Sequence, residues 1–275
     1  MRFCPYKSCQ PAIFCCAIIL CCVFQVNAQK KSYELTIMTY NIYHGEDPYN
    51  RGKANLDSVA SLIKRYNPDF VMLQEVDSMT NRLKDVYGER LNWMKELAKK
   101  TGMHDYFAKA ISFGDGGYGE GLLSKQQLNF TVTNLPAPLG GEDRSMISVE
   151  YPLTKNKKII VGGTHLCHEH SENRVAQLKQ INENFGKAGI PYILAGDFNL
   201  TPDSPEYAQA IKPLWKDAAA LFGKTENSFS SDKPERRIDY VLLDKKAAWK
   251  VKSVEVIDVR YSDHLPVVVK LELVY

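Results

Sequence analysis

Polar side chains that could support metal and acid–base chemistry occur in six short motifs, each beside an apolar run. The motifs are Thr39-Tyr40-Asn41, Gln74-Glu75-Val76-Asp77, Thr164-His165, Gly196-Asp197-Phe198-Asn199, Arg237-Ile238-Asp239-Tyr240 and Ser262-Asp263-His264. A strand end is rigid and the loop beyond it is open to substrate, so this placement suits a functional site. Each motif alone also fits an ordinary turn or helix cap. Together they predict one site of carboxylates, amides and histidines.

These residue types suit the hydrolysis of a phosphate ester. Mg²⁺ takes oxygen ligands, often one or two carboxylates with water and phosphate oxygens, and Glu75 and Asp263 could supply the carboxylates. The attacking water must lose a proton, which a buried carboxylate or a histidine can accept. A histidine works best when an acceptor on its other nitrogen fixes the tautomer. The possible pairs of this kind are Asp239 with His264, and Glu120 with His165.

In this order, from about Glu34 to the C-terminus, the motifs resemble those of the endonuclease/exonuclease/phosphatase superfamily. That superfamily includes pancreatic-type deoxyribonucleases, abasic-site endonucleases, sphingomyelinases and inositol-polyphosphate phosphatases. The resemblance implies an α/β fold, a four-layer α/β/β/α sandwich in which two mixed β-sheets pack face to face with helices outside. It also implies Mg²⁺, or Mn²⁺ or Ca²⁺, at the ends of the sheets.

The resemblance implies a role for each residue by its motif position. Glu75 would be the main metal carboxylate, helped by Asn41 and Asp263. Asp197 would orient or deprotonate the attacking water, and Asn199 would contact the phosphate. His264, held by Asp239, would act as a base or stabilise the transition state. His165 matches the second histidine of deoxyribonuclease-like and sphingomyelinase-like members. Glu120, in Tyr118-Gly119-Glu120-Gly121, resembles the acid that pairs with that second histidine in pancreatic-type deoxyribonucleases.

Other polar residues have two readings. Arg144 precedes an expected strand, where its guanidinium could clamp a phosphate or form a surface ion pair. We expect His44 to line the substrate pocket, because it lies just beyond Asn41. His168 and His170 could hold a second metal, but loop histidines near a site are more often solvated.

Strands and helices alternate along the chain. Apolar spacing predicts helices at 57–66, around Trp93 to Leu97, and from Val175 to Phe185. The expected strands are 35–40, 70–73, 146–151, 158–164, 190–195, 238–243, 251–257 and 267–273, with a possible hairpin that pairs 122–123 with 130–132. The glycine-rich segment 114–121 lacks the lysine of a phosphate-binding loop and is expected to be a flexible loop beside the site. No low-complexity linker interrupts the chain, so 29–275 is expected to be one domain.

The first 28 residues differ from the rest. Arg2 and Lys7 precede an apolar run from Ala12 to Val26, and a small-residue pattern ends at Ala28. This is typical of a signal peptide cleaved near Ala28 and predicts a secreted or periplasmic protein without a stable membrane anchor. An uncleaved anchor and a lipoprotein are the alternatives. Of seven cysteines only Cys167 lies outside this segment, which excludes an intrachain disulfide and a cysteine-rich zinc site in the remainder.

Composition narrows the substrate only partly. The formal charge of +3 falls to +1 without Arg2 and Lys7, which disfavours a strongly basic nucleic-acid groove. No apolar hairpin tip of the kind a sphingomyelinase needs is evident. We therefore expect a monomer acting on a small or lipid-derived phosphoester, such as an inositol phosphate or a sugar phosphate, then nucleic acid, then sphingomyelin. A catalytically silent binding module would lack an acid or a histidine of the set, and a zinc peptidase would need paired helical histidines.

Overall fold

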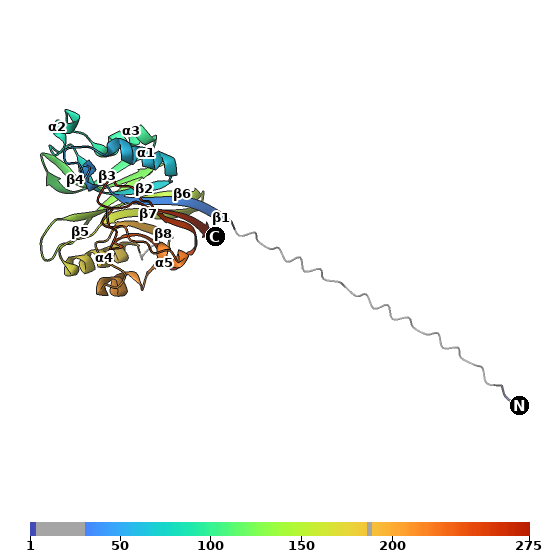
Figure 1. The fold of residues 1–275 in the computed structure, drawn as a ribbon. Helices are drawn as coiled ribbons and strands as arrows, with labels where there is room; N and C mark the ends of the chain where they lie inside the picture. The colour runs from blue at the N-terminus through green and yellow to red at the C-terminus, as the bar shows by residue number, and fades with distance from the viewer. Residues whose placement is uncertain (4–30, 186–188) are drawn as a thin grey trace. The chain divides into compact units, whose positions relative to one another are not determined.

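The computed structural model describes residues 1–3, 31–185 and 189–275, and Lys31–Tyr275 forms one compact unit (Figure 1). Apart from residues 1–3, the expected signal peptide lies outside the described residues, and so does its cleavage point. None of the helices in the described part of the chain is long and apolar enough to cross a membrane.

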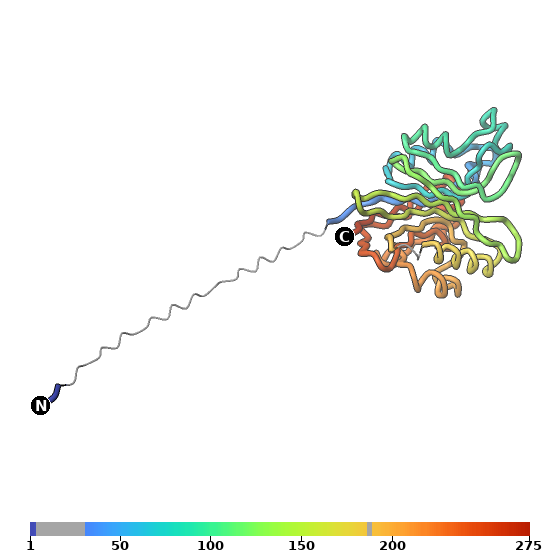
Figure 2. The backbone as a smooth tube through the Cα atoms, turned by 180° about the vertical axis from the view of Figure 1, so that it is seen from behind, coloured from blue at the N-terminus to red at the C-terminus, as the bar shows by residue number. Residues whose placement is uncertain are grey.

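The unit is built on two six-stranded sheets that lie face to face, as the trace in Figure 2 also shows. In spatial order the first sheet contains β11 (Ala248–Val256), β12 (Val267–Val274), β1 (Ser32–Asn41), β2 (Phe70–Ser78), β4 (Gly116–Ser124) and β3 (His104–Phe113). The second contains β5 (Phe130–Leu135), β6 (Arg144–Thr154), β7 (Lys157–His165), β8 (Tyr192–Asp197), β10 (Asp239–Asp244) and β9 (Trp215–Asp217). The pairs β1–β2 and β7–β8 are parallel and the others antiparallel, so both sheets are mixed.

Helices cover the outer faces of both sheets. The helices are α1 (Leu56–Tyr66), α2 (Lys84–Tyr87), α3 (Trp93–Thr101), α4 (Ser171–Phe185) and α5 (Ala218–Phe222), with short helical turns η1 (Tyr43–Gly45) and η2 (Tyr207–Ile211). Alternate side chains of the strands reach opposite layers, as strand geometry requires. Ile37 of β1 packs between the sheets, whereas its neighbour Met38 packs under α1 and α3. A third cluster joins α4 to the second sheet. The expected four-layer sandwich is confirmed.

The three predicted helices are present with nearly the expected bounds, but two expectations about strands are wrong. Residues 122–123 and 130–132 do not form a hairpin, because β4 and β5 belong to different sheets. The Tyr106 hydroxyl holds the crossing segment, accepting a hydrogen bond from the Leu128 amide at 2.6 Å. The glycine-rich segment 114–121 is a tight turn followed by most of β4 rather than a flexible loop. A Cβ at Gly119 would collide with the Ala108 carbonyl oxygen of β3, so glycine is needed for this close pairing.

Candidate active site

Strand register brings the polar motifs to one end of the sandwich. His165, the last residue of β7, lies opposite Asp197, the last residue of β8. Asp197 in turn lies opposite Asp239, the first residue of β10. In the other sheet, Asn41 at the end of β1 pairs with Gln74 of β2. The motifs are distant in sequence and become neighbours because β1, β7 and β8 end, and the antiparallel β10 begins, at the same end of the sandwich.

The Asp197 carboxylate is the centre of the site. Its Oδ2 lies 3.3 Å from Asn41 Nδ2, 3.3 Å from His165 Nε2 and 3.5 Å from His264 Nε2. Its Oδ1 accepts a hydrogen bond of 2.9 Å from the backbone amide of Asn199. Asp197 is 1% exposed, and burial raises the pKa of its carboxyl group above the ordinary value. Asn41 comes from the first sheet and Asp197 from the second, so the site joins the two sheets.

His264 is held between two carboxylates. Its Nδ1 lies 2.9 Å from Asp239 Oδ2, and the Ser228 hydroxyl donates to the same oxygen at 2.6 Å. The Phe229 ring packs on the imidazole, with ring centroids 4.8 Å apart. Burial alone would lower the pKa of His264, but the charges of Asp239 and Asp197 outweigh it and raise this pKa to about 10. The ring is therefore an imidazolium at neutral pH.

Glu75 owes its position to an irregularity in β2. The pairing of β2 with β4 shifts between Leu73 and Val76, and Glu75 has a φ of 59°. A bulge of this kind redirects a side chain, and a positive φ at a non-glycine residue is strained and is often found at functional sites. Glu75 Oε1 accepts a hydrogen bond from Asn41 Nδ2 at 3.1 Å, and Oε2 lies 3.8 Å from His44 Nδ1. Burial opposes ionisation, yet the nearby His44 imidazole and the hydrogen bond from Asn41 lower the pKa of Glu75.

Glu75, Asp263 and Asn41 fit a hard divalent cation. All three offer oxygen atoms, the ligand type that Mg²⁺, Mn²⁺ and Ca²⁺ share. Burial raises the pKa of Asp263, and the negative charge of Glu75 raises it further, so the two carboxylates repel each other. A cation between them would remove that repulsion. Asp197, Asp239 and His264 also offer ligand atoms within 4.8 Å of one another, but an imidazolium already supplies the positive charge there.

The surroundings of His165 differ from the expectation. Its Nδ1 lies 3.2 Å from Arg144 Nη1, not beside Glu120. Glu120 instead accepts a hydrogen bond from the Ser145 hydroxyl, and burial raises the pKa of Glu120 to about 8. The predicted pairing of Glu120 with His165 is therefore wrong. The physical reason is that Glu120 points into the packed interior, where a neutral carboxyl is favoured.

Arg144 fits neither of its two expectations, a phosphate clamp or a surface ion pair. Its guanidinium is 3% exposed and lies against protein groups: Glu142 Oε1 at 2.5 Å, His165 Nδ1, and His168 Nδ1 at 3.1 Å. It is thus a buried neighbour of His165. His168 and His170 point their Nε2 atoms toward the Glu169 carboxylate, at 3.5 and 3.7 Å, in an exposed loop. His168 therefore reaches the edge of the site through Arg144, whereas the His170 side chain pairs with Glu169 in this loop.

His44 and Asn199 contact other polar residues of the site. His44 Nε2 is 3.2 Å from Glu46 Oε2, so the ring bridges Glu46 and Glu75. The Asn199 amide lies against His165 Nε2 at 2.9 Å and donates to the Leu166 carbonyl at 3.0 Å. The sequence interpretation missed Ser228 and Phe229, which support Asp239 and His264 from a loop without apolar periodicity. Their one sequence signal is position, a short distance before the Arg237-Ile238-Asp239-Tyr240 motif.

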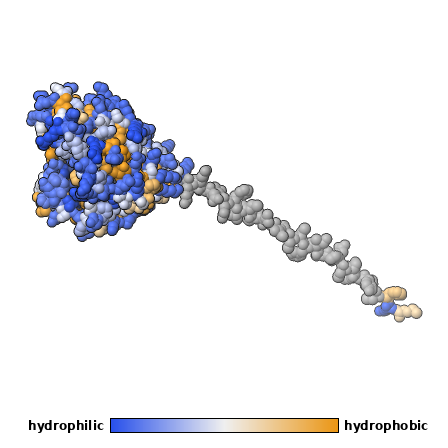
Figure 3. Space-filling view, viewed as in Figure 1, coloured by the Kyte–Doolittle hydropathy of each residue, from blue (hydrophilic) through white to orange (hydrophobic). Residues whose placement is uncertain are grey.

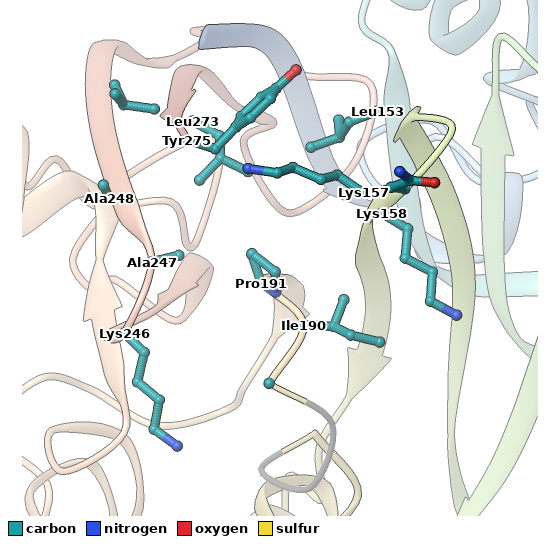
Figure 4. A pocket seen from close by; sticks show the side chains of 13 residues that line it. Leu153, Lys157, Lys158, Ile190, Pro191, Lys246, Ala247, Ala248, Leu273 and Tyr275 are labelled. Atoms are coloured by element: carbon teal, nitrogen blue, oxygen red, sulfur yellow. The ribbon is translucent and has the colours of Figure 1, made fainter. Parts of the chain in front are cut away.

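A separate cavity of about 560 Å³ lies at the other end of the same strands (Figure 4). Lys157, the first residue of β7, lines it, and its amine lies over the Tyr275 ring, 4.4 Å from the ring centroid. Pro191 and Leu273 form part of the apolar wall. None of the residues of the candidate active site lines this cavity, so the cavity is not the candidate active site.

Comparison with known proteins agrees with this geometry. Residues 38–264 match the model of the Endonuclease/Exonuclease/phosphatase family. The chain belongs to this family. Its members are phosphoesterases and nucleases that generally depend on divalent metals, and the predicted family is confirmed.

Individual relatives are distant. Carbon catabolite repressor protein 4 homolog 3 of Arabidopsis thaliana is 26% identical over 197 residues, which are 62% of this chain and 41% of that protein. An endonuclease/exonuclease/phosphatase from Beutenbergia cavernae aligns with a TM-score of 0.74 at 24% identity, over 87% of this chain and 72% of that one. A mannosyl-6-phosphatase of Bacteroides thetaiotaomicron aligns with a TM-score of 0.68 at 17% identity, over 88% of this chain and 100% of that one. The human Nocturnin catalytic domain aligns with a TM-score of 0.67 at 22% identity, over 89% of this chain and 98% of that one. These structures share the fold.

Proposed function

We propose that the protein hydrolyses a small or lipid-derived phosphoester, such as a sugar phosphate or an inositol phosphate, with Mg²⁺ as its metal. The observation that carries the proposal is the environment of Asp197 Oδ2, with nitrogen atoms of Asn41, His165 and His264 within 3.5 Å. A buried carboxylate surrounded in this way can orient a water molecule and accept its proton. Glu75, Asp263 and Asn41 would hold the metal, which neutralises charge on the phosphate and orients it.

Each side chain then has a defined task. Asp197 receives the proton of the attacking water at a carboxylate oxygen, because burial makes this carboxylate a stronger base than an ordinary aspartate. The His264 imidazolium faces the same point and stabilises negative charge that develops on the phosphate oxygens. Asp239 maintains that positive charge through the 2.9 Å hydrogen bond. Asn199 and His165 donate hydrogen bonds to a phosphate oxygen from the side of Asp197 opposite His264.

The surroundings favour a compact substrate over a nucleic acid. Of the basic residues that could line a groove, Arg82 stacks on the Phe113 ring at 4.2 Å with its Nε 3.3 Å from Asp77, and Arg90 lies 3.4 Å from the Asp115 carbonyl oxygen. On another side, Tyr49 and Ser231 connect two loops through a 2.7 Å hydrogen bond. The mannosyl-6-phosphatase supports the idea that this fold can accept a sugar phosphate.

A lipid-derived substrate has one further observation in its favour. The surface in Figure 3 is mostly hydrophilic, but Phe113, at the tip of the β3–β4 hairpin, is half exposed. The sequence alone did not indicate an apolar hairpin tip, since 114–121 was expected to be a loop. One aromatic side chain covered on one face by Arg82 is a small apolar contact, and we rank sphingomyelin below small phosphoesters for that reason.

The test is a substrate panel with the purified 29–275 chain. Mannose 6-phosphate, inositol phosphates, sphingomyelin and plasmid DNA are compared with Mg²⁺, with Mn²⁺ and with excess chelator. We expect turnover of a small phosphoester that chelation abolishes and Mg²⁺ restores. Activity that survives exhaustive chelation contradicts the metal mechanism, and preferential cleavage of DNA contradicts the proposed substrate class.

We also propose that the protein is exported, on the basis of the basic start, apolar run and small-residue pattern of the first 28 residues. Intact mass measurement of the protein from the cell exterior or the periplasm tests this. An N-terminus near Gln29 is expected, and a chain that retains Met1 contradicts cleavage.

A further inference from the structure

The Nδ1 side of the His165 imidazole faces a group that can only donate hydrogen bonds. Arg144 Nη1 lies 3.2 Å from His165 Nδ1, and both side chains are almost fully buried. A guanidinium has only N–H donors and stays protonated in proteins. The nitrogen that faces it must therefore accept, and His165 Nδ1 must carry no proton.

We propose that Arg144 is a positioning residue that fixes His165 as the neutral Nε2–H tautomer. A neutral imidazole carries one proton, so once Nδ1 is an acceptor, Nε2 must be the donor. Nε2 lies 3.3 Å from Asp197 Oδ2, at the centre of the site. His165 therefore acts as a hydrogen-bond donor toward Asp197 or a substrate phosphate, and it does not act as a proton-accepting base. The functional consequence rests on the proposed phosphoesterase reaction.

The contact between Asn199 and His165 conflicts with a proton on Nε2. Its Nδ2 lies 2.9 Å from His165 Nε2, which would place a donor against a donor. Every nitrogen of a guanidinium is a donor, so Arg144 decides the tautomer. The same Asn199 Nδ2 donates to the Leu166 carbonyl oxygen at 3.0 Å, and a turned amide would lose that hydrogen bond. We infer that Asn199 Nδ2 keeps this bond and gives up its position against Nε2 to a substrate oxygen.

The charged groups around His165 agree with a neutral ring. Those that face it are Arg144 of β6, Glu75 of β2, Asp197 at the end of β8, His168 of the following loop and His264 before β12. Burial is the largest influence and lowers the pKa of His165, and Arg144 lowers it further. Glu75 acts in the opposite direction but does not outweigh them. The ring stays uncharged where His264 is an imidazolium.

The pairing differs from the one expected by resemblance. An acid at Nδ1 would place the proton on Nδ1 and favour an imidazolium, so that the ring could release a proton. An arginine there has the opposite effect on both the tautomer and the charge. His165 is thus set up to bind an oxygen anion rather than to transfer a proton.

The decisive measurement is ¹⁵N NMR of the imidazole rings in the histidine-labelled 29–275 chain, without metal or substrate. The His165 signals are assigned by their loss in His165→Gln. We expect one protonated nitrogen, Nε2, and one bare nitrogen, Nδ1, unchanged from pH 5 to pH 8. A proton on Nδ1, or two protonated nitrogens near neutral pH, overturns the proposal.

Two variants test whether Arg144 is the cause. Arg144→Gln should give a mixture of tautomers and allow the ring to charge at low pH, whereas Arg144→Lys should retain the Nε2–H form because ammonium is also only a donor. Arg174→Gln is the matched control, since Arg174 is a largely buried arginine that is paired with Glu206 at 2.7 Å and whose guanidinium contacts the loop after His165 through the Cys167 and His168 carbonyl oxygens. An Arg144→Gln spectrum identical to wild type contradicts the proposal. If Arg144→Gln does not fold, the wild-type and Arg144→Lys spectra still decide.

Kinetics separates this inference from the proposed function. Arg144→Gln should lower kcat/KM about 10–100-fold, the range for loss of a partner that orients a functional side chain, and Arg144→Lys should recover most of it. Wild-type protein with the expected tautomer but no phosphoester turnover would contradict the proposed function and leave the tautomer standing. An active wild type with the other tautomer would do the reverse.

Discussion

The two sides of Asp197 hold the same kind of side chain in opposite charge states. On one side, His264 has Asp239 at 2.9 Å from Nδ1, and its pKa rises to about 10. On the other, His165 has Arg144 at 3.2 Å from Nδ1, and its pKa falls. Both rings are buried, so burial alone does not distinguish them. The sign of the charge next to Nδ1 decides whether the imidazole is a cation or a neutral donor.

This difference suits one reaction. A buried carboxylate that must take a proton from water benefits from one nearby cation, which stabilises the phosphate charge that develops in the transition state. A second imidazolium would lower the basicity of Asp197 further. A neutral donor at His165 can bind a phosphate oxygen without that effect.

The largest expected effect is the loss of turnover when His264 or Asp197 is removed. His264→Ala or Asp197→Ala should lower kcat by about 10³-fold or more, because each removes a group that acts directly on the reacting atoms. His165→Ala should cost less, about 10²-fold, since it removes one neutral hydrogen-bond donor. His170→Ala, in the exposed loop, is the control. Steady-state kinetics and circular dichroism of the four variants test the order, and equal losses for His264→Ala and His165→Ala would break the comparison.

The second expected effect is on the pH profile. In Asp239→Asn the His264 ring loses the carboxylate that holds its pKa near 10, and burial then lowers the pKa. The alkaline limb of kcat/KM should move to lower pH, with a loss of about 10²-fold at neutral pH. Ser228→Ala, which removes a hydroxyl but keeps the carboxylate, is the matched control and should leave the limb in place. An unshifted limb in Asp239→Asn would show that His264 is not the group that titrates there.

Local signals predicted the individual helices and strands, whereas the four-layer fold and the roles of the site residues were implied by the resemblance of the motifs to the family. The apolar spacing of 57–66 and the run 70–73 gave α1 and the start of β2, and each polar motif follows or precedes such a run. The partner of His165 could not be predicted. Glu120 and Arg144 both lie in strands near it, and which of them faces Nδ1 depends on side-chain direction after two sheets have packed. The length of β2 was also missed, because its bulge at Glu75 has no local sequence signal.

A third and smaller effect concerns the metal. Glu75→Gln keeps the shape of the side chain but removes its charge, so the apparent affinity for Mg²⁺ should fall about 10–100-fold, with partial recovery of turnover at high Mg²⁺. Glu169→Gln, at an exposed carboxylate beside His168, should leave the affinity unchanged. Activity titrated against free Mg²⁺ measures this. If Asp239→Asn were rescued by Mg²⁺ as well as Glu75→Gln, then the cluster of Asp197, Asp239 and His264 would be the metal site.

The smallest effect is on stability, at the buried carboxyl group next to Ser145. The pKa of Glu120 is about 8 in the folded protein against an ordinary value of 4.5, because burial disfavours its charge. The folded state therefore keeps a proton that the unfolded chain releases between these values. This stabilisation is complete below pH 4.5, is lost as pH rises toward 8, and does not change above that, with a slope of at most about 1.4 kcal/mol per pH unit.

Glu120→Gln should remove this slope, because an amide stays neutral at every pH. Urea unfolding at pH 5 and pH 8 should show wild type losing more stability than the variant, while Glu150→Gln, at a surface carboxylate bound to Lys158, should follow wild type. A wild-type slope retained in Glu120→Gln would mean that the carboxyl is already ionised when folded. An anion at Glu120, close enough to Arg144 for the two charges to interact, would compete with His165 for that guanidinium and weaken the contrast between the two histidines.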